Sequence, residues 1–243
     1  INNIYKITPI LNNMKVSLSF EKTITEDTSI MVDALRASTT ITLALNNFKE
    51  IIPCFSVDEA LKLSEKYNSV TAGERSGKKI DQFDVGNSPR EVEKFKIPED
   101  KSQTLILTTS NGTRILKDMK STVLIGSMLN GKAVAKKAIE LCHREIDVVM
   151  AGYKGNFALE DFLVSGEIIY WIYKLSNKCE LTDFAKASIL ATRDYEQVCK
   201  GIYNSNSGKK LEKMGNEKDV ECCVLKNITT NVGIYSDGKI KLL

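Results

Sequence analysis

MVDALRASTTI, residues 31–41, is the stretch that decides the fold of this chain. The apolar run at residues 29–32 predicts a buried parallel strand, and a polar turn with Asp33 and Arg36 follows it. A Ser-Thr-Thr cluster then opens a segment with the apolar periodicity of a helix. A strand that passes through a polar turn into a helix is typical of an α/β sheet, and ligands bind such sheets at the carboxyl ends of the strands.

The side chains of this turn suit an anionic ligand. Arg36 offers a fork-shaped guanidinium and Ser38 and Thr39 offer hydroxyls, while the helix start offers free N–H groups for a phosphate or another oxyanion. Asp33 beside them would hold a cation or activate a nucleophile. Ser and Thr are also ordinary helix caps and Asp is an ordinary turn former, so one such turn alone is more often structural.

Four later strand ends repeat the pattern. Each predicted strand runs directly into small, hydroxyl-bearing, amide or acidic residues, and this regularity favours a site over ordinary solvated loops. The stretches are GERSGKKIDQFDVGNSPRE at 73–91, TLILTTSNGT at 104–113, STVLIGSMLNG at 121–131 and IDVVMAGYKGNFALED at 146–161. They contribute Glu74, Asp84, Asn87, Ser88, Thr109, Asn111, Gly112, Ser127, Asn130, Glu160 and Asp161 as candidate site residues.

Strand and helix signals alternate along the whole chain. Capping boxes that begin at Ser56 and Ser88 predict helix starts. We expect Thr182 to cap a helix that runs to about residue 200, a polar linker to follow at 204–208, and a Ser-Asp-Gly turn at 236–238 to join two strands.

This alternation predicts a layered α/β/α fold with a mostly parallel or mixed sheet. We expect two related lobes, 1–120 and 121–243, in which the TTSNGT and GSMLNG turns are equivalent, with one compact domain as the alternative.

The five motifs, in this order, resemble the 2-phosphosulfolactate phosphatase family. The resemblance rests on VDALRASTTI, GERSGKKIDQFDVGNSP, TTSNGT, GSMLNGKAVA and AGYKGNFALEDFLVSGEI, and it continues through NSGKKLEKMGNEKDVECC. It therefore covers nearly the whole chain. What the resemblance implies is a magnesium-dependent phosphatase that removes phosphate from 2-phospho-3-sulfolactate, a small anionic phospho-sulfo-acid, in a step toward coenzyme M.

Composition agrees with a cytoplasmic enzyme. In 243 residues, 34 Lys and Arg balance 31 Asp and Glu to a net charge of +3, which is too even to predict binding to nucleic acid. No apolar run approaches the roughly 18 residues of a membrane helix, and the first residues lack a signal-peptide pattern. The six cysteines show no CxxC spacing and are expected to be reduced thiols. We expect no membrane partner and a homo-oligomer, a dimer.

Several phosphatase mechanisms lack the residues they need. The single histidine, His143, stands at a predicted helix end, and no cysteine has an arginine six places later. The GxxxxGK[ST] and GxGxxG fingerprints are absent. An aspartyl-phosphate route through Asp33 stays open, although Leu35 occupies the place of the second aspartate in the DxDx[TV] pattern.

Metal-assisted hydrolysis is the mechanism that we favour. Mg²⁺ prefers one or two carboxylates together with water and substrate phosphate. We expect Asp33, Glu74 and Asp84 to bind the metal, and Asp33, Arg36, Glu160 and Asp161 to act in catalysis. Residues expected to bind the substrate are Ser38, Thr39, Asn87, Ser88, Thr109, Asn111, Gly112, Ser127 and Asn130.

Other functions are compatible with the same residues. The alternative role of each candidate carboxylate is structural, as a helix cap or in a surface ion pair. The turns would also suit a non-catalytic sensor of a small phosphorylated acid, a phosphatase for a different 2-phospho-acid, or a scaffold whose hydroxyls only cap helices. A sensor would bind its ligand without releasing phosphate.

Overall fold

The computed structural model describes residues 14–109, 112–116, 119–176 and 178–243. Within these residues one eleven-stranded sheet forms the framework, in the order β5-β4-β6-β3-β11-β10-β7-β2-β8-β1-β9. The strands are β1 Met14–Phe20, β2 Thr28–Val32, β3 Glu50–Cys54, β4 Val70–Arg75, β5 Lys78–Lys79, β6 Thr104–Thr108, β7 Thr122–Gly126, β8 Glu145–Met150, β9 Cys179–Leu181, β10 Gly233–Ser236 and β11 Lys239–Leu242. The helices are α1 Ala37–Ala44, α2 Val57–Tyr67, α3 Pro89–Lys94, α4 Gly112–Leu116, α5 Gly131–Leu141, α6 Leu159–Leu175, α7 Asp183–Ala191, α8 Tyr195–Asn204, α9 Asn206–Lys213 and α10 Glu217–Cys223, with a short 3₁₀ turn at Met128–Asn130.

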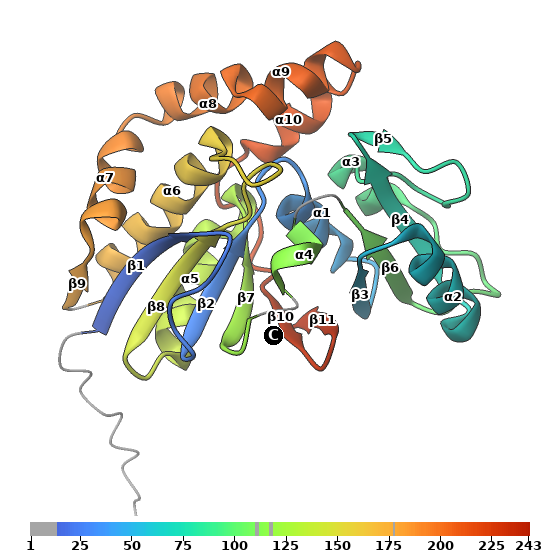
Figure 1. Cartoon of the computed structure of the whole chain (residues 1–243), viewed down its shortest axis with the longest axis horizontal. Coiled ribbons are helices and arrows are strands. Elements are labelled where there is room, and N and C mark those ends of the chain that lie inside the picture. Colours follow the sequence, from blue (N-terminus) through green and yellow to red (C-terminus); the bar gives the residue numbers. More distant parts are fainter. Residues whose placement is uncertain (1–13, 110–111, 117–118, 177) are drawn as a thin grey trace, which may run out of the picture.

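Two groups of parallel strands are joined by an antiparallel hairpin. β2 pairs in parallel with β7 and β8, and β1 pairs in parallel with β8 and β9. In the other group, β6 pairs in parallel with β3 and β4. The β10–β11 hairpin, red in Figure 1, pairs antiparallel with β7 on one side and with β3 on the other. The predicted layered α/β fold with a mostly parallel, mixed sheet is confirmed.

The division into lobes 1–120 and 121–243 stays a prediction. The pairing shows that strands from the first part of the chain lie in both groups. β1 and β2 belong with β7, β8 and β9, whereas β3, β4, β5 and β6 form the other group.

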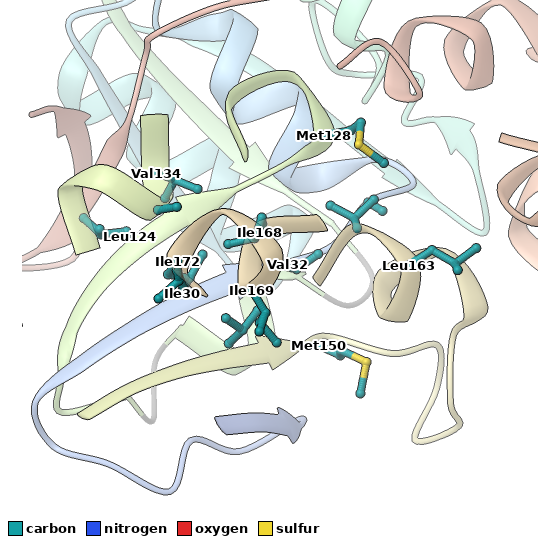
Figure 2. Packing of buried hydrophobic residues seen from close by; sticks show 14 of the residues in the cluster. Ile30, Val32, Leu124, Met128, Val134, Met150, Leu163, Ile168, Ile169 and Ile172 are labelled. Carbon is teal, nitrogen blue, oxygen red and sulfur yellow. The ribbon is translucent and has the colours of Figure 1, made fainter. Parts of the chain in front are cut away.

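Alternate side chains of β2 face two hydrophobic cores. All five residues of β2 are buried, as expected for a parallel strand covered on both faces. Ile30 and Val32 pack against the α6 side, and Figure 2 shows them beside Ile168, Ile169 and Ile172 of that helix. Met31, between them in sequence, belongs to the core on the opposite face.

The helix α1 lies where the two strand groups meet. It contacts β7 and α3, and its Ile41 shares a core with Leu105 and Leu107 of β6. All eight residues of α1 are buried, including three threonines and a serine. The Ser38 hydroxyl donates to the Asp33 carbonyl oxygen at 2.8 Å and the Thr39 hydroxyl donates to the Ala34 carbonyl oxygen at 3.2 Å. These contacts hold the turn after β2 against the first turn of α1.

Local sequence signals predicted several element ends correctly. The Ser56 hydroxyl accepts the Glu59 N–H at 3.1 Å and begins α2. The Ser88 hydroxyl accepts the Glu91 N–H at 3.3 Å and begins α3. The turn at 236–238 joins β10 to β11, as predicted.

Two predictions in the C-terminal third are wrong. The helix expected from Thr182 to about residue 200 is two helices, because Asp194 accepts the N–H groups of the following turn, Gln197 among them at 3.2 Å, and starts α8 afresh. The expected linker at 204–208 contains the beginning of α9, since the Ser205 hydroxyl accepts the Gly208 N–H at 3.0 Å. In the described part of the chain, no helix has both the length and the apolar character to cross a membrane.

Candidate active site

A pocket opens where four of the predicted strand ends converge. Asp33 follows β2, Glu74 lies near the end of β4, Thr109 follows β6, and Tyr153 lies in the loop after β8. Residues of the helix α9 also line the pocket. The lining residues are Asp33, Leu35, Arg36, Glu74, Ser76, Gly77, Asn87, Thr109, Tyr153, Lys154, Ser207, Lys210 and Leu211.

Asp33 is a buried carboxylate in an acidic environment. One of its oxygens accepts the Ala37 N–H at 3.2 Å. Burial, together with the negative charges of Glu74 and Glu160, raises the pKa of Asp33 to about 7, although the N–H groups of Ala37 and Gly112 act in the opposite direction. The free energy of keeping Asp33 ionised is therefore high unless a cation or a proton comes to the site.

Gly112 allows the chain to approach Asp33 closely. A Cβ atom at this position would lie 2.7 Å from Oδ2 of Asp33 and 3.0 Å from Cβ of Ala37. Any side chain here would displace the carboxylate. The structure therefore gives Gly112 a positioning role next to Asp33, at the site where the sequence predicted a substrate contact.

Glu74 is held by the turn between β4 and β5. Its Oε2 accepts the Gly77 N–H at 2.5 Å, and Gly77 has a φ of 89°, which favours glycine. Ser76 and Gly77 line the pocket beside Glu74. The tight turn thus directs a buried carboxylate toward the same space as Asp33.

Arg36 lines the pocket but is already paired. Its Nη1 forms a buried ion pair with Asp219 of α10, and its Nη2 donates to the Gly77 carbonyl oxygen at 3.2 Å. Asp219 also accepts the Ser88 hydroxyl at 2.6 Å. Ser88, predicted to bind substrate, therefore caps α3 and contacts Asp219.

Asp161 holds two strand-end loops together. Its two carboxylate oxygens accept the N–H groups of Ala34 at 2.8 Å and Gly152 at 2.9 Å. Burial and the charges of Asp33 and Glu160 raise the pKa of Asp161 well above its ordinary value, although both N–H groups oppose that shift. The residue does not line the pocket, so the structure assigns it a positioning role for the loops after β2 and β8.

Glu160 lies beside the pocket without lining it. It is buried in the first turn of α6 and lines a neighbouring hollow, which shares Tyr153 and Ser207 with the pocket. Its negative charge acts on both Asp33 and Asp161.

Asn87 and Thr109 are brought into the pocket, as the sequence predicted. Both are buried and both line it. The Oδ1 atom of Asn87 is buried and has no hydrogen-bond partner among the described residues. An orphaned acceptor in a pocket wall calls for a donor or a cation from a ligand.

Other predicted residues are used in structural contacts. The Ser127 N–H donates to Oδ1 of Asn130 at 2.8 Å, and the Asn130 side chain donates to the carbonyl oxygens of Ile125 and Asn231. These two residues close the turn after β7 on themselves and do not reach the pocket. Ser38 and Thr39 bond the preceding turn, as described above, and Asn111 lies outside the described residues.

Asp84 lies away from Asp33 and Glu74. Its Oδ2 accepts both the N–H and the hydroxyl of Thr71, at 2.7 and 2.8 Å. The residue is exposed and does not line the pocket. The structure therefore does not bring it together with the other two predicted metal ligands.

Tyr153, Lys154, Ser207 and Lys210 are among the pocket residues that were not predicted from the sequence. The first two stand in the GYKG segment after β8, where the prediction chose Glu160 and Asp161 instead. Ser207 falls in the segment 204–208 that was expected to be a linker, and Lys210 follows it in α9. The helix start at Ser205 was not identified from the sequence.

The carboxylates of the pocket suit magnesium better than a metal that needs a protein cage. The described residues contain no group of three or more His, Cys, Asp and Glu side chains placed to hold a metal. Among the described lining residues, Asp33 and Glu74 carry carboxylates and Asn87 adds an unsatisfied oxygen. Mg²⁺ commonly binds one or two carboxylates and completes its shell with water and substrate phosphate, so this donor set fits it.

Comparison with known proteins finds relatives that match most of the chain. The family model described as 2-phosphosulpholactate phosphatase matches residues 14–238. The 2-phosphosulfolactate phosphatase of Methanothermobacter thermautotrophicus is 45% identical over 230 residues, which cover 95% of this chain and 96% of the relative. The probable 2-phosphosulfolactate phosphatases of Clostridium acetobutylicum and Clostridium beijerinckii are 38% and 37% identical, over 90% and 87% of this chain and 94% and 90% of their own lengths.

Proposed function

This chain belongs to the 2-phosphosulfolactate phosphatase family, and we propose that it is a phosphoric monoester hydrolase that converts 2-phospho-3-sulfolactate and water into 3-sulfolactate and phosphate. The observation that carries the proposal is a pocket at converging strand ends that is lined both by the carboxylates of Asp33 and Glu74 and by the ammonium groups of Lys154 and Lys210. Carboxylates suit a divalent cation that meets a phosphate, and ammonium groups suit the other anionic groups of such a substrate.

Magnesium is part of the proposal. Asp33 and Glu74 would hold the ion, and the unsatisfied Oδ1 of Asn87 supports a cation or a donor at the same place. A divalent cation would relieve the repulsion between Asp33, Glu74 and Glu160. When bound, Mg²⁺ supplies Lewis-acid polarisation of the phosphoryl group.

The proposed reaction is a direct hydrolysis. The oxygen of a water molecule bonds to phosphorus while the bond from phosphorus to the C2 oxygen of the substrate breaks. That C2 oxygen takes one proton of the water, and the other stays with the phosphate. Asp33 orients the attacking water, and Asn87 and Thr109 contact phosphoryl oxygens. Leu35, in the place of a second aspartate, favours this route over an aspartyl-phosphate.

Phosphate release tests the proposal directly. The purified protein is incubated with 2-phospho-3-sulfolactate and with a panel of other 2-phospho-acids, each with Mg²⁺ and with EDTA. We expect Mg²⁺-dependent release that is fastest from 2-phospho-3-sulfolactate. A faster reaction with another member of the panel would show that the other acid, and not 2-phospho-3-sulfolactate, is the preferred substrate.

The sensor and scaffold alternatives give different results in the same samples. A sensor would be stabilised against thermal unfolding by the phospho-acid without releasing phosphate. At a ligand concentration a hundred times the Kd, the stabilisation is about 2.7 kcal/mol. A scaffold would show neither stabilisation nor turnover.

Three further expectations complete the proposal. We expect the product, 3-sulfolactate, to be used in coenzyme M biosynthesis, as the family resemblance implies. Unpaired cysteines at six positions support a reducing compartment, the cytoplasm. A homodimer stays a prediction, which light scattering of the purified protein would test.

A further inference from the structure

The wall of the pocket formed by α9 is basic. Lys210 and Ser207 of α9 line it, together with Tyr153 and Lys154 from the loop after β8. These residues line the same pocket as Asp33 and Glu74, which stand at the ends of other strands. Carboxylates from the strand ends and ammonium groups from α9 and the β8 loop therefore line one pocket, together with the Arg36 guanidinium from the turn after β2.

Lys210 is held in place by Tyr153. The Nζ atom of Lys210 lies 3.2 Å from the Tyr153 hydroxyl oxygen and 5.4 Å from the centroid of its ring. The Nζ atom of Lys154 lies 5.5 Å from the same centroid. Two ammonium groups thus flank one aromatic ring at the pocket, an arrangement that cation–π attraction supports.

The corner between α8 and α9 gives Lys210 a defined position. Ser205 caps α9, and a Cβ atom at Gly208 would lie 2.3 Å from the Ile202 carbonyl oxygen. The chain therefore turns tightly here, and only glycine fits. Lys210 follows two residues later, in the same short helix.

Lys210 differs from Arg36, another cation that lines the pocket. Arg36 has Asp219 as a buried anionic partner. Lys210 is half-buried, and within the described ranges it forms no ion pair with an Asp or Glu side chain. A half-buried ammonium group that faces a pocket and has only a neutral tyrosine hydroxyl as partner is suited to an anion from a ligand.

We propose that Lys210, positioned by Tyr153 and assisted by Lys154, binds the sulfonate group of the substrate and makes the pocket specific for a sulfonated phospho-acid. The inference rests on the proposed function. A sulfonate is fully ionised at neutral pH, so an ammonium group attracts it, whereas the carboxylates of Asp33 and Glu74 repel it. With the phosphate at the cation and the sulfonate at Lys210, the substrate enters in one orientation.

The test compares two substrates that differ only in the sulfonate. 2-Phospholactate has a hydrogen atom in place of the sulfonate of 2-phospho-3-sulfolactate. We expect Lys210→Met to lower kcat/KM for 2-phospho-3-sulfolactate by at least about tenfold more than for 2-phospholactate, mainly through KM, and Lys210→Arg to keep part of the preference. A site built around an ionic contact rejects the analogue that lacks the group.

A matched control and a folding check accompany the variants. Lys209→Met removes an exposed ammonium group from the same helix outside the pocket and should leave the substrate preference as in the wild type. Thermal unfolding of all variants without ligand shows whether α9 remains folded. Equal losses for both substrates in a folded Lys210→Met variant, or no loss for either, would overturn the inference.

Calorimetric binding of 3-sulfolactate separates this inference from the proposed function. If the wild type binds 3-sulfolactate and Lys210→Met loses at least about tenfold in affinity, the sulfonate site stands even where no phosphate is released and the phosphatase proposal fails. If the wild type releases phosphate but both proteins bind 3-sulfolactate equally, the phosphatase proposal stands and the sulfonate site fails. Absence of both binding and turnover in the wild type refutes both.

Discussion

Arg36 and Asp219 form a buried ion pair although 183 residues separate them in the sequence. Both side chains are 5% exposed. Through this pair and its neighbours, the turn before α1 contacts the carbonyl oxygen of Gly77, and α10 contacts Ser88 at the start of α3. The pair therefore holds together elements that form one side of the pocket.

Removal of the Asp219 charge should destabilise the protein strongly. Asp219→Asn keeps the shape of the side chain but leaves the buried Arg36 charge without its partner, which typically costs about 3–5 kcal/mol. Urea unfolding measures the change in the free energy of unfolding. Glu217→Gln, at an exposed position of the same helix, should stay within about 0.5 kcal/mol of the wild type. An unchanged midpoint for Asp219→Asn would mean that the pair contributes little.

Arg36→Lys should lower kcat/KM by at least about tenfold, or 1.4 kcal/mol, because lysine keeps the charge but loses the fork that contacts Asp219 and Gly77 together. Comparison with Asp219→Asn decides how Arg36 acts. If Arg36 acts only by positioning the pocket, both variants lose activity in proportion to their loss of stability. A larger kinetic loss for Arg36→Lys at equal stability would show a direct contact with the substrate.

Because of Asp27, the free energy of unfolding should depend on pH in the acidic range. Burial alone would raise the pKa of Asp27, but the N–H groups of Glu145, Arg144 and His143 hold it below its ordinary value. A carboxyl whose pKa is lowered by folding stabilises the protein above the unfolded pKa, and this contribution disappears as the pH falls through the folded pKa. Asp27→Asn should therefore lower the free energy of unfolding at pH 7, and this difference from the wild type should shrink as the pH falls through the folded pKa of Asp27.

Denaturant unfolding of wild type and variant between pH 7 and pH 2 measures the Asp27 effect. Glu26→Gln, at the exposed neighbouring position, supplies the control and should lack it. A difference between Asp27→Asn and wild type that stays constant down to pH 2 would contradict the assignment to this carboxylate.

The Mg²⁺ requirement of the phosphatase activity should change when Glu74 is substituted and should stay the same when Asp84 is substituted. EDTA should abolish phosphatase activity, and Mg²⁺ should restore it. Glu74→Gln removes one of the pocket carboxylates and should raise the Mg²⁺ concentration needed for half-maximal activity by at least about tenfold. Asp84→Asn, whose side chain bonds Thr71 outside the pocket, should leave that concentration unchanged. Full activity of the metal-free wild type would exclude the magnesium mechanism.

Signals within a few residues of each other predicted the parts of this fold that depend on local geometry. Ser56 and Ser88 cap helices through N–H groups three residues away, and Asp33 stands at a strand end because an apolar run precedes it. The carboxyl ends of parallel strands lie at the same edge of a sheet, so Glu74 and Thr109 were expected near Asp33. All three line the pocket.

Contacts between distant segments could not be predicted in this way. Nothing near Arg36 in the sequence indicates that it forms an ion pair with Asp219. Its guanidinium was therefore expected to bind an anionic group of the substrate. Ser127 and Asn130 were expected to donate to a ligand, but the Ser127 N–H donates to Oδ1 of Asn130, and the Asn130 amide donates to the carbonyl oxygens of Ile125 and Asn231. Lys210 was missed because a linker was expected at 204–208, whereas the Ser205 hydroxyl caps a helix there whose residues Ser207 and Lys210 line the pocket.

Asp33 should be essential without becoming phosphorylated. Asp33→Asn keeps the size of the side chain but removes the charge that faces Glu74 and the pocket, so most activity should be lost. Direct attack by water predicts that wild-type enzyme quenched in acid during turnover carries no covalent phosphate. A nucleophilic Asp33 would instead pass through an aspartyl-phosphate, since a covalent route must form one. Mass spectrometry of the peptide that contains Asp33, with beryllofluoride binding as a second probe, decides between the two routes. A stoichiometric phosphorylated peptide would replace direct hydrolysis by the covalent mechanism, despite the leucine at position 35.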